Sequence, residues 1–500
     1  MAEEEQRVYA VVNIPPEIDA YSTVRFSRSP DSKIDSINWI YRQSAEQAAG
    51  SAEKFFDSYY FQYGHGSIAD CGHVTMAIEQ YSQLMAEEIE DEPLWDGQEQ
   101  STRYQDFSQP RFWMPHDWSD ETLKRIYQET IQGLFQSYRK LADRMFAVYA
   151  ERNPKPEAMK QDAYERTIKA RAFDVARYLL PMATLTNVGQ ITSIRTLEKQ
   201  IQRLLASRHP EIKILAYAMK EACKKPAYDV AREILGATML PEIAAAPTLA
   251  KYLEPDVYLE GTRKRLNEMA DSLLPKVMAD SVRHVDLVDP DDYFMETIIT
   301  ALYWVSDYSY RQVQQVVRDM MNQSQRKEVW NALFADRDQH HELLWLFRGG
   351  YPLIFDICVD IGADRDLKRH RRCIKIRQDL SHLYGCAIPP ILMGEGLTSE
   401  LNQYIKATSK SNLVCRQIAQ VYPYEALYVL PLGFRRRRLY KMDPAELCYI
   451  AELRTGVKGH FSYREAAYRM YELAMERYPE LKEFEDARVT HPSVEDTLTR

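Results

Sequence analysis

The sequence predicts a mixed α+β fold with more helix than strand, arranged as two related halves. The first observation is a repeated motif: residues 98–104 read QEQSTRY, and residues 378–384 read QDLSHLY 280 positions later. The second is another repeated segment, RYLLPM at 177–182 and LYVLPL at 427–432, which lies 250 positions on. The third is that long helical patterns outnumber short strand-like ones. A duplicated chain of this kind suggests two domains within 500 residues.

Taken in order, the first strand-like runs are Tyr9–Ile14 and His73–Ile78, which are short and rich in apolar or β-branched residues. Residues 119–150 then carry apolar side chains at three- and four-residue steps, with Ser119 or Asp120 as N-cap, and predict a long helix. A shorter amphipathic helix follows near 197–205. In the second half, Leu353–Val359 is a strand-like run, and 447–453 matches the helix near 197–205.

The domain limits follow from the repeat and from a segment that carries three prolines, Pro241 to Pro255. The offset between the copies falls from 280 to 250, which places a deletion among the helices inside the second copy. The last residues are polar with no apolar period, typical of a surface tail. The expected division is an N-terminal domain at 1–240, a linker at 241–256, a C-terminal domain at 257–480 and a polar tail at 481–500.

Composition excludes several classes of protein. The net charge of −9 argues against an electrostatic nucleic-acid binder, and no segment approaches the ~20 apolar residues of a membrane span. The N-terminus is acidic and lacks the apolar stretch of a secretory signal. The seven cysteines form no CxxC pair, and His340-His341-Glu342 has no third ligand at a suitable spacing, so we expect no metal site. These features predict a cytoplasmic protein.

Charge separates the two copies. Upstream of the first motif lies an acidic run, Glu87–Glu92, whereas the second copy has a basic run, Lys368–Arg372, preceded by Arg365. Guanidinium groups form bidentate hydrogen bonds with phosphate, so the basic run suits a nucleotide or dinucleotide. A solvated basic face is the plain alternative. The sign reversal favours the first interpretation, because a solvated face needs no acidic counterpart.

Two further segments carry candidate anion-binding groups. The first motif places Ser101 and Thr102 beside Arg103, and together with backbone N–H groups they could cradle a phosphate; a helix N-cap has the same pattern. Arg435–Arg438 is a run of four arginines that alternate between two faces, of which we expect one or two to meet an anion and the rest to be solvated.

The order and spacing of these motifs resemble the flavin-dependent thymidylate synthases (ThyX). That family has an Arg-His-Arg triplet, a serine in E-x-S-x-R-Y, an arginine before Leu-Pro, an Asn-x-Arg and a late Leu-Arg. The resemblance covers roughly residues 20–215 and 340–480, and it includes Gly64–Ser67 near the expected flavin. It implies two tandem ThyX-like domains, each with helices packed around a small, mostly antiparallel sheet.

Each half matches only part of the family pattern. The first keeps the cradle and Arg177 but has Ile89-Glu90-Asp91 in place of Arg-His-Arg, while the second keeps the triplet and Leu453-Arg454. The second in turn has Leu383 and Leu427 in place of Arg103 and Arg177. Because each family site lies between subunits, the two halves are complementary and could assemble one composite site per chain.

The resemblance implies a role for each matching residue. Arg454 is the expected catalytic residue, which stabilises negative charge on the pyrimidine. The expected substrate-binding residues are Glu99, Gln100, Ser101, Thr102, Arg103, Arg177, Arg365, Arg369 and Arg454. The expected cofactor-binding residues are His65, Ser67, Arg195, Arg369, His370 and Arg371. Asp366 departs from the family, which has glutamine there, and nine residues instead of seven separate Arg371 from Ser381.

The implied activity is transfer of a one-carbon unit from 5,10-methylenetetrahydrofolate to C5 of dUMP through FAD, with NADPH as reductant. Two alternatives stay open: a non-catalytic flavin- or nucleotide-binding paralogue, and the same chemistry on UMP or an RNA uridine. Family members are tetramers, so a fused pair is expected to form a homodimer with pseudo-tetrameric form.

Overall fold

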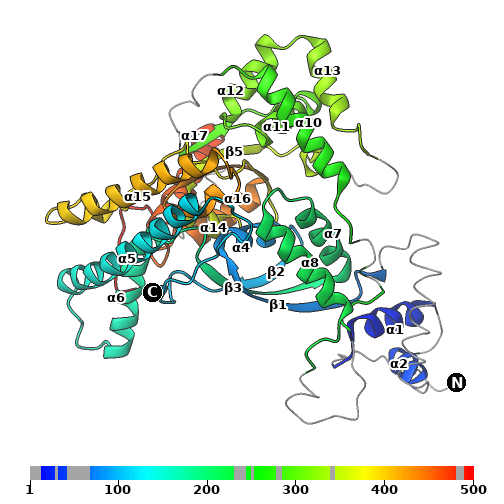
Figure 1. Cartoon of the computed structure of the whole chain (residues 1–500), viewed down its shortest axis with the longest axis horizontal. Coiled ribbons are helices and arrows are strands. Elements are labelled where there is room, and N and C mark those ends of the chain that lie inside the picture. Colours follow the sequence, from blue (N-terminus) through cyan, green and yellow to red (C-terminus); the bar gives the residue numbers. More distant parts are fainter. Residues whose placement is uncertain are drawn as a thin grey trace. The chain divides into compact units, whose positions relative to one another are not determined.

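The computed structural model describes the chain in ten stretches, within which the helices and strands can be followed in Figure 1. These are residues 13–28, 32–41, 68–229, 244–248, 250, 253–276, 284–337, 344–348, 350–479 and 489–499. No helix within these stretches is both long and apolar enough to cross a membrane.

The chain forms two compact units that combine distant segments. The first comprises 1–78, 88–98 and 188–256, and the second 79–87, 99–187 and 257–500. In the first unit α7 (Ile194–Leu205) packs on α8 (Pro210–Lys224), and α1 (Pro16–Arg28) on α2 (Lys33–Tyr41). The other helices among the described residues before 257 are α4 (Gln83–Glu90), α5 (Glu121–Arg152), α6 (Gln161–Ala176) and the 3₁₀ turn η3 (Arg177–Leu179).

The helices after residue 256 begin with a group that precedes the sheet of the second half. These are α10 (Val257–Leu273), α11 (Tyr293–Trp304), α12 (Tyr310–Gln315), η4 (Val316–Met320), α13 (Gln323–Ala332) and η5 (Trp345–Phe347). The later ones are α14 (Ile361–Leu367), η6 (Pro390–Met393), α15 (Thr398–Ala419), η7 (Glu425–Val429), α16 (Pro444–Arg454) and α17 (Phe461–Arg477). The predicted helix-rich α+β class is confirmed.

Two small sheets share one strand order. The strands are β1 (His73–Ser82), β2 (Asp96–Glu99), β3 (Leu185–Ser193), β4 (Val285–Val288), β5 (Leu353–Asp360), β6 (Ile374–Arg377) and β7 (Arg435–Met442). One sheet runs β1-β3-β2 and the other β4-β5-β7-β6. In the second sheet every pair is antiparallel. The order β5-β7-β6 therefore repeats β1-β3-β2, with β4 added at the edge.

The halves meet through reciprocal backbone hydrogen bonds at the repeated Leu-Pro segments. The N–H of Met182 donates to the carbonyl of Leu430, and the N–H of Leu432 donates to the carbonyl of Leu180, both at 2.9 Å. The two donors, Met182 and Leu432, are 250 positions apart, and so are the two acceptors, Leu180 and Leu430. Each bond is therefore the equivalent of the other in the repeat. This reciprocity is the signature of a two-fold relation, here within one chain.

A second pair of equivalent backbone hydrogen bonds fixes the register of the repeat more closely than the motifs do. Gln83 N–H donates to Thr184, and its counterpart Ile361 N–H donates to Phe434, an offset of 278 on the donor side. The equivalent of Arg369 is therefore Asp91, and the first-half residues that replace the triplet are Asp91, Glu92 and Pro93. The expected Ile89-Glu90-Asp91 is wrong by two positions, because motif spacing alone could not locate the two residues inserted before Ser381.

The deletion predicted in the second copy corresponds to helix α6. In the first half α5 is followed by α6 and then η3, whereas in the second half α15 leads to η7 with no helix between. Helices α5 and α15 pack against each other, as Figure 1 shows. Helix α6 packs on α5 and ends beside Arg177.

Several local predictions hold. The predicted helix at 119–150 is α5, and the Asp120 carboxylate caps it by accepting from the N–H groups of Thr122 and Leu123 at 2.9 and 3.0 Å. The strand-like runs His73–Ile78 and Leu353–Val359 became β1 and β5, and the two matched helices became α7 and α16. Of the run Tyr9–Ile14, residues 9–12 lie outside the described residues. Part of the proposed linker, including 241–243, and residues 481–488 of the tail lie outside the described residues.

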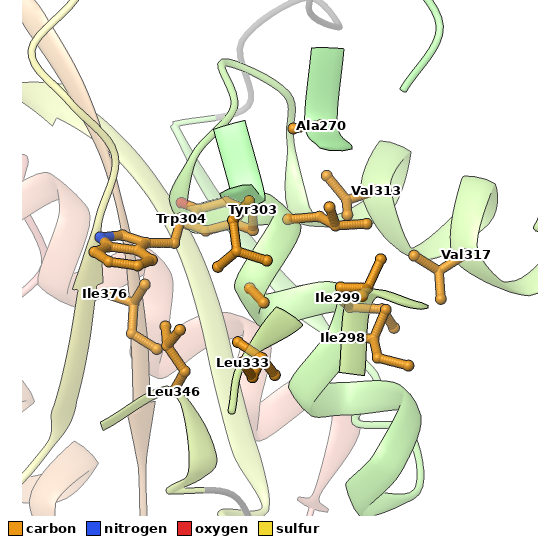
Figure 2. Packing of buried hydrophobic residues seen from close by; sticks show 14 of the residues in the cluster. Ala270, Ile298, Ile299, Tyr303, Trp304, Val313, Val317, Leu333, Leu346 and Ile376 are labelled. Carbon is orange, nitrogen blue, oxygen red and sulfur yellow. The ribbon is translucent and has the colours of Figure 1, made fainter. Parts of the chain in front are cut away.

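A large apolar core supports one face of the second sheet. Figure 2 shows Ile298, Ile299, Tyr303 and Trp304 of α11 packed among side chains from the neighbouring helices. Ile376 of β6 and Leu439 of β7 belong to the same cluster. Burial of these side chains fixes β6 and β7 against the helices, and so fixes the segments that lead into and out of the candidate site.

Candidate active site

The four consecutive arginines form strand β7 and are not solvated as expected. Arg436, Arg437 and Arg438 are 4%, 2% and 1% exposed. Arg438 donates from Nε and Nη2 to the two oxygens of Asp364 at 2.9 and 2.8 Å. The expectation that most of the arginines are solvated was wrong, because β7 is central in its sheet and the side chains on both of its faces are buried from Arg436 onwards.

Asp364 of α14 keeps its charge in this buried place. Burial alone favours the neutral acid, but Arg438 and Arg436 outweigh it and lower the pKa of Asp364 to about 2. Tyr440 also donates its hydroxyl to Asp364, at 3.0 Å. The arginines of β7 thus hold α14 against the sheet, and α14 leads directly into the basic run.

A second buried network joins residues of both halves. Glu87 of α4 accepts from Arg436 at 2.7 Å and lies 2.8 Å from the ammonium of Lys368. Arg365 of α14 donates to Gln83 and to the carboxylate of Glu99. The predicted substrate residues Arg365 and Glu99 therefore contact each other. The acidic run of the first copy and the basic run of the second are partners at this point.

Arg177 is a buried cation with few partners. It is 2% exposed, its Nη2 donates to the carbonyl of Gly362 at 3.2 Å, and its Nη1 lies 3.5 Å from the Thr102 hydroxyl. Asp366 lies 3.9 Å away. Nε has no hydrogen-bond partner among the described residues. Burial lowers the pKa of Arg177, as expected for a charge short of compensating contacts.

Arg103 is held by α6, the helix that only the first half possesses. Its Nε and Nη2 donate to Asp174 at 2.8 and 3.2 Å. Nη1 donates to the Tyr463 hydroxyl at 3.3 Å, and Nη2 also reaches the carbonyl of Lys458 at 3.3 Å. The cradle arginine of the first half is thereby fixed against the start of α17 in the second.

Arg454 is oriented by a neutral histidine. Its Nε donates to His370 Nε2 at 2.9 Å, and its guanidinium lies 5.7 Å from the centre of the Tyr463 ring. Burial and the charge of Arg454 lower the pKa of His370 to about 3. The ring is therefore neutral, and since Nε2 accepts, Nδ1 carries the proton and faces Glu446 at 3.3 Å. The Nη groups of Arg454 make no hydrogen bond to any described residue.

The remaining candidates take varied positions. Arg369 and Arg371 are exposed, and no described residue pairs with Arg369. The Ser101 hydroxyl accepts from the N–H of Arg103 at 3.2 Å, and Ser381 accepts likewise from Leu383, which agrees with the proposed equivalence of the cradles. Gln100 N–H donates to Asn187.

Of the three remaining cofactor candidates, the structure describes only Arg195. Arg195 belongs to the first compact unit, at the start of α7, and pairs with Asp70 at 3.1 Å. His65 and Ser67 fall outside the described residues.

Sequence reasoning missed the residues that position the arginines. Asp174 and Tyr463 contact Arg103, and Tyr463 also lies against Arg454. His460, fully buried, contacts the backbone carbonyl of Asp174 through Nε2 at 3.1 Å. No motif marks them. Of these residues, Asp174 alone could have been singled out from the sequence, because it lies in the segment that the second copy lacks.

The chain matches the model of one protein family in two segments. The model of the family described as "Thymidylate synthase complementing protein" (Thy1) matches residues 12–227 and 296–480. The chain belongs to the Thy1 family. The two matched segments fit the tandem arrangement of two family-like halves.

Whole-length relatives of this Thy1 protein carry names that assign no activity. The UPF0159 protein of Chlamydia muridarum is 27% identical over 453 residues, which cover 88% of this chain and 82% of the relative. The UPF0159 protein of Chlamydia pneumoniae is 25% identical over 491 residues, covering 92% and 87%. The UPF0159 protein Ta1429 of Thermoplasma acidophilum is 25% identical over 496 residues, covering 91% and 92%.

Two solved structures show partial similarity to this chain. The flavin-dependent thymidylate synthase ThyX of Helicobacter pylori, complexed with FAD and dUMP, is 14% identical with a TM-score of 0.27, covering 46% of this chain and 96% of that one. The UMP/dUMP methylase PolB of Streptomyces cacaoi, bound with 5-Br dUMP, is 14% identical with a TM-score of 0.29, covering 41% and 84%.

Proposed function

We propose that this Thy1 protein is a flavin-dependent methyltransferase that acts on C5 of dUMP at one composite site per chain. The main support is that the candidate arginines of the first half contact the second half. Arg177 donates to the backbone of Gly362, and Arg103 contacts Tyr463, which also lies against Arg454. Each half alone lacks part of this set. Family membership supplies the class of chemistry.

The charges suit a nucleotide phosphate. Arg177 is buried with an incomplete set of hydrogen bonds, and Arg369 is exposed with no pairing partner among the described residues. Guanidinium groups in this condition favour a bidentate anion such as phosphate. Asp366, at 3.9 Å from Arg177, opposes a second negative charge nearby and limits how far a larger polyphosphate could extend.

The residues present also fit FAD. Exposed Arg369 and Arg371 beside the buried His370 are suited to a diphosphate. The bound flavin would supply the redox and one-carbon transfer chemistry, with methylenetetrahydrofolate and NADPH as its co-substrates. His370 Nε2 accepts from Arg454, which supports a role for His370 in positioning that arginine beside the cofactor.

The protein groups act by positioning and by electrostatics. Arg103, Arg177 and Arg369 hold the phosphate, while the free Nη groups of Arg454 stabilise negative charge on the pyrimidine and make C5 a better nucleophile. The neutral His370 fixes the direction of Arg454 without competing for the developing charge. No protein nucleophile is required. We further propose that two chains associate as a homodimer.

The test is an absorbance spectrum of the purified protein with FAD, titrated with dUMP and then with UMP, followed by tritium release from C5. A flavin spectrum perturbed by dUMP, with release that is lost in Arg454→Ala but kept in the exposed-surface variant Arg166→Gln, supports the proposal. A response to UMP instead shifts the substrate to a ribonucleotide. A protein that stays colourless with added FAD rules the proposal out and leaves a non-catalytic paralogue.

A further inference from the structure

The segment 489–499 at the end of the chain is hydrogen-bonded to the second compact unit through two arginines. Arg171 of α6 donates from Nη2 to the carbonyl of Asp496 at 2.9 Å and from Nε to that of Thr497 at 3.2 Å. Arg464 of α17 donates to the carbonyl of Val494 at 2.8 Å. Composition predicted only a polar surface tail here.

The same two arginines also hold the loop 455–459, which directly follows Arg454. Arg464 Nε donates to the carbonyl of Thr455 at 2.9 Å. Arg171 donates to the carbonyls of Val457 and Gly459, at 3.1 and 3.4 Å. Each arginine therefore bridges the loop and the C-terminal segment. A third link is direct, since the N–H of Thr490 donates to the Thr455 hydroxyl at 3.0 Å.

The bridged loop touches the composite site at two points. At its start, Thr455 follows Arg454 and is fully buried. In its middle, the carbonyl of Lys458 accepts from Arg103 at 3.3 Å. The loop has little room to move: a Cβ on Gly459 would come within 2.8 Å of the Tyr463 ring. Displacing it would move the backbone beside both arginines.

We propose that Arg171 and the segment 489–499 form a clasp that positions the loop 455–459, and through it Arg454 and Arg103, for nucleotide binding. Arg171 is a positioning residue, because it acts on the loop and on the C-terminal segment by donating to backbone carbonyls. It lies on α6, the helix that the second half lacks, so the clasp is specific to this one site. The expected effect on nucleotide binding rests on the proposed function, whereas the contacts that define the clasp do not.

Two variants break the clasp independently: truncation after residue 488 and Arg171→Gln. Arg166→Gln is the matched control, since Arg166 is exposed on the same helix. The first measurement is hydrogen exchange of the full protein without ligand. Both variants should exchange faster in residues 455–464, with α5 unchanged, while the control matches the parent. Unchanged exchange in this loop would overturn the clasp whether or not the protein binds dUMP.

The second measurement is dUMP affinity by calorimetry. We expect the dissociation constant to rise by about tenfold or more in both variants, the scale of loss when binding groups are misplaced. Adding the peptide of residues 489–500 to the truncated protein should restore part of the affinity. Faster exchange with unchanged dUMP affinity would reduce the clasp to a structural strap and overturn the positioning role. A parent protein that binds no dUMP would instead count against the proposed function.

Discussion

Arg177 shows how a single residue can point to a ligand through what it lacks. A buried guanidinium normally forms close ion pairs or several hydrogen bonds, because removing its charge from water costs several kcal/mol. Here Asp366 is 3.9 Å away and Nε is unpartnered among the described residues. A phosphate would complete the set. At the equivalent position of the second half the chain has Leu427, which shows that this backbone accepts leucine.

The first prediction follows from that equivalence. Arg177→Leu should weaken dUMP binding roughly 100-fold, the scale of losing hydrogen bonds to a charged group, at about 1.5–3 kcal/mol. The melting temperature should change little, since an apolar group often replaces a poorly compensated buried charge without loss. Calorimetric titration and thermal melting measure both. The volume-conserving Leu427→Met is the control. Equal affinity in Arg177→Leu and the parent would remove Arg177 from the site.

The second prediction concerns His370, which the fold keeps neutral. Its folded-state pKa is about 3, well below the ordinary 6.5, so between these values the unfolded chain binds a proton that the folded chain does not. Stability from this group is present above about pH 6.5 and declines as the pH falls towards 3, by up to about 1.4 kcal/mol per pH unit.

His370→Asn should therefore flatten the dependence of the unfolding free energy on pH between pH 4 and 6, by up to one proton. Urea unfolding at several pH values measures the slope. Buried His460, whose pKa burial also lowers, continues to contribute in both proteins. An unchanged slope would show that His370 titrates normally in the folded state.

Strand β7 shows how a whole element can bury charged side chains when each one finds a partner. For the four arginines in a row we expected one or two to meet an anion and the rest to be solvated. The strand is instead central in its sheet, and its arginines pair with Asp364, Glu87 and Asp356. This compensation is divided between faces, because alternate residues of a strand point in opposite directions. The partners come from α14, α4 and β5, elements far apart in the sequence.

The third prediction tests that element. Arg438→Met should reduce the unfolding free energy by about 3–5 kcal/mol, because it leaves Asp364 buried without its bidentate partner. The control is Arg372→Met: Arg372 is exposed and pairs with Asp443 at the surface, so this change should cost about 0–1 kcal/mol. Chemical denaturation compares the two. Equal losses would mean that Asp364 is neutralised or solvated in the folded protein.

At the scale of the whole molecule, the proposed function assigns one site to each chain in place of two equivalent ones. The reciprocal bonds at Leu180 and Leu430 keep the two-fold relation of the halves, while the functional residues no longer obey it. Leu383 and Leu427 stand where the other half has Arg103 and Arg177. A site assembled from the opposite set would lack both of the arginines that we propose to bind the phosphate.

The fourth prediction is therefore a stoichiometry of one dUMP per chain. Calorimetric titration of the protein with dUMP should give a single class of sites at this ratio. Replacing both leucines, as Leu383→Arg with Leu427→Arg, should not create a second site, because Asp91 and Glu92 stand where the triplet's Arg369 and His370 would be needed. Two dUMP per chain in the parent would show that the opposite site still functions.

The sequence by itself determined the fold class, the repeat, the family resemblance and which half keeps each motif. These depend on local pattern: periodicity fixes α5, an N-cap fixes where it begins, and motif order fixes the likeness. The tertiary structure alone decided which charges face each other. Asp174, Tyr463 and the segment 489–499 reach the arginines from distant positions, and Arg436, Arg437 and Arg438 of β7 are buried in ion pairs although most of the run was expected to be solvated. Long-range electrostatic pairing has no period along a chain, so only the folded backbone could reveal it.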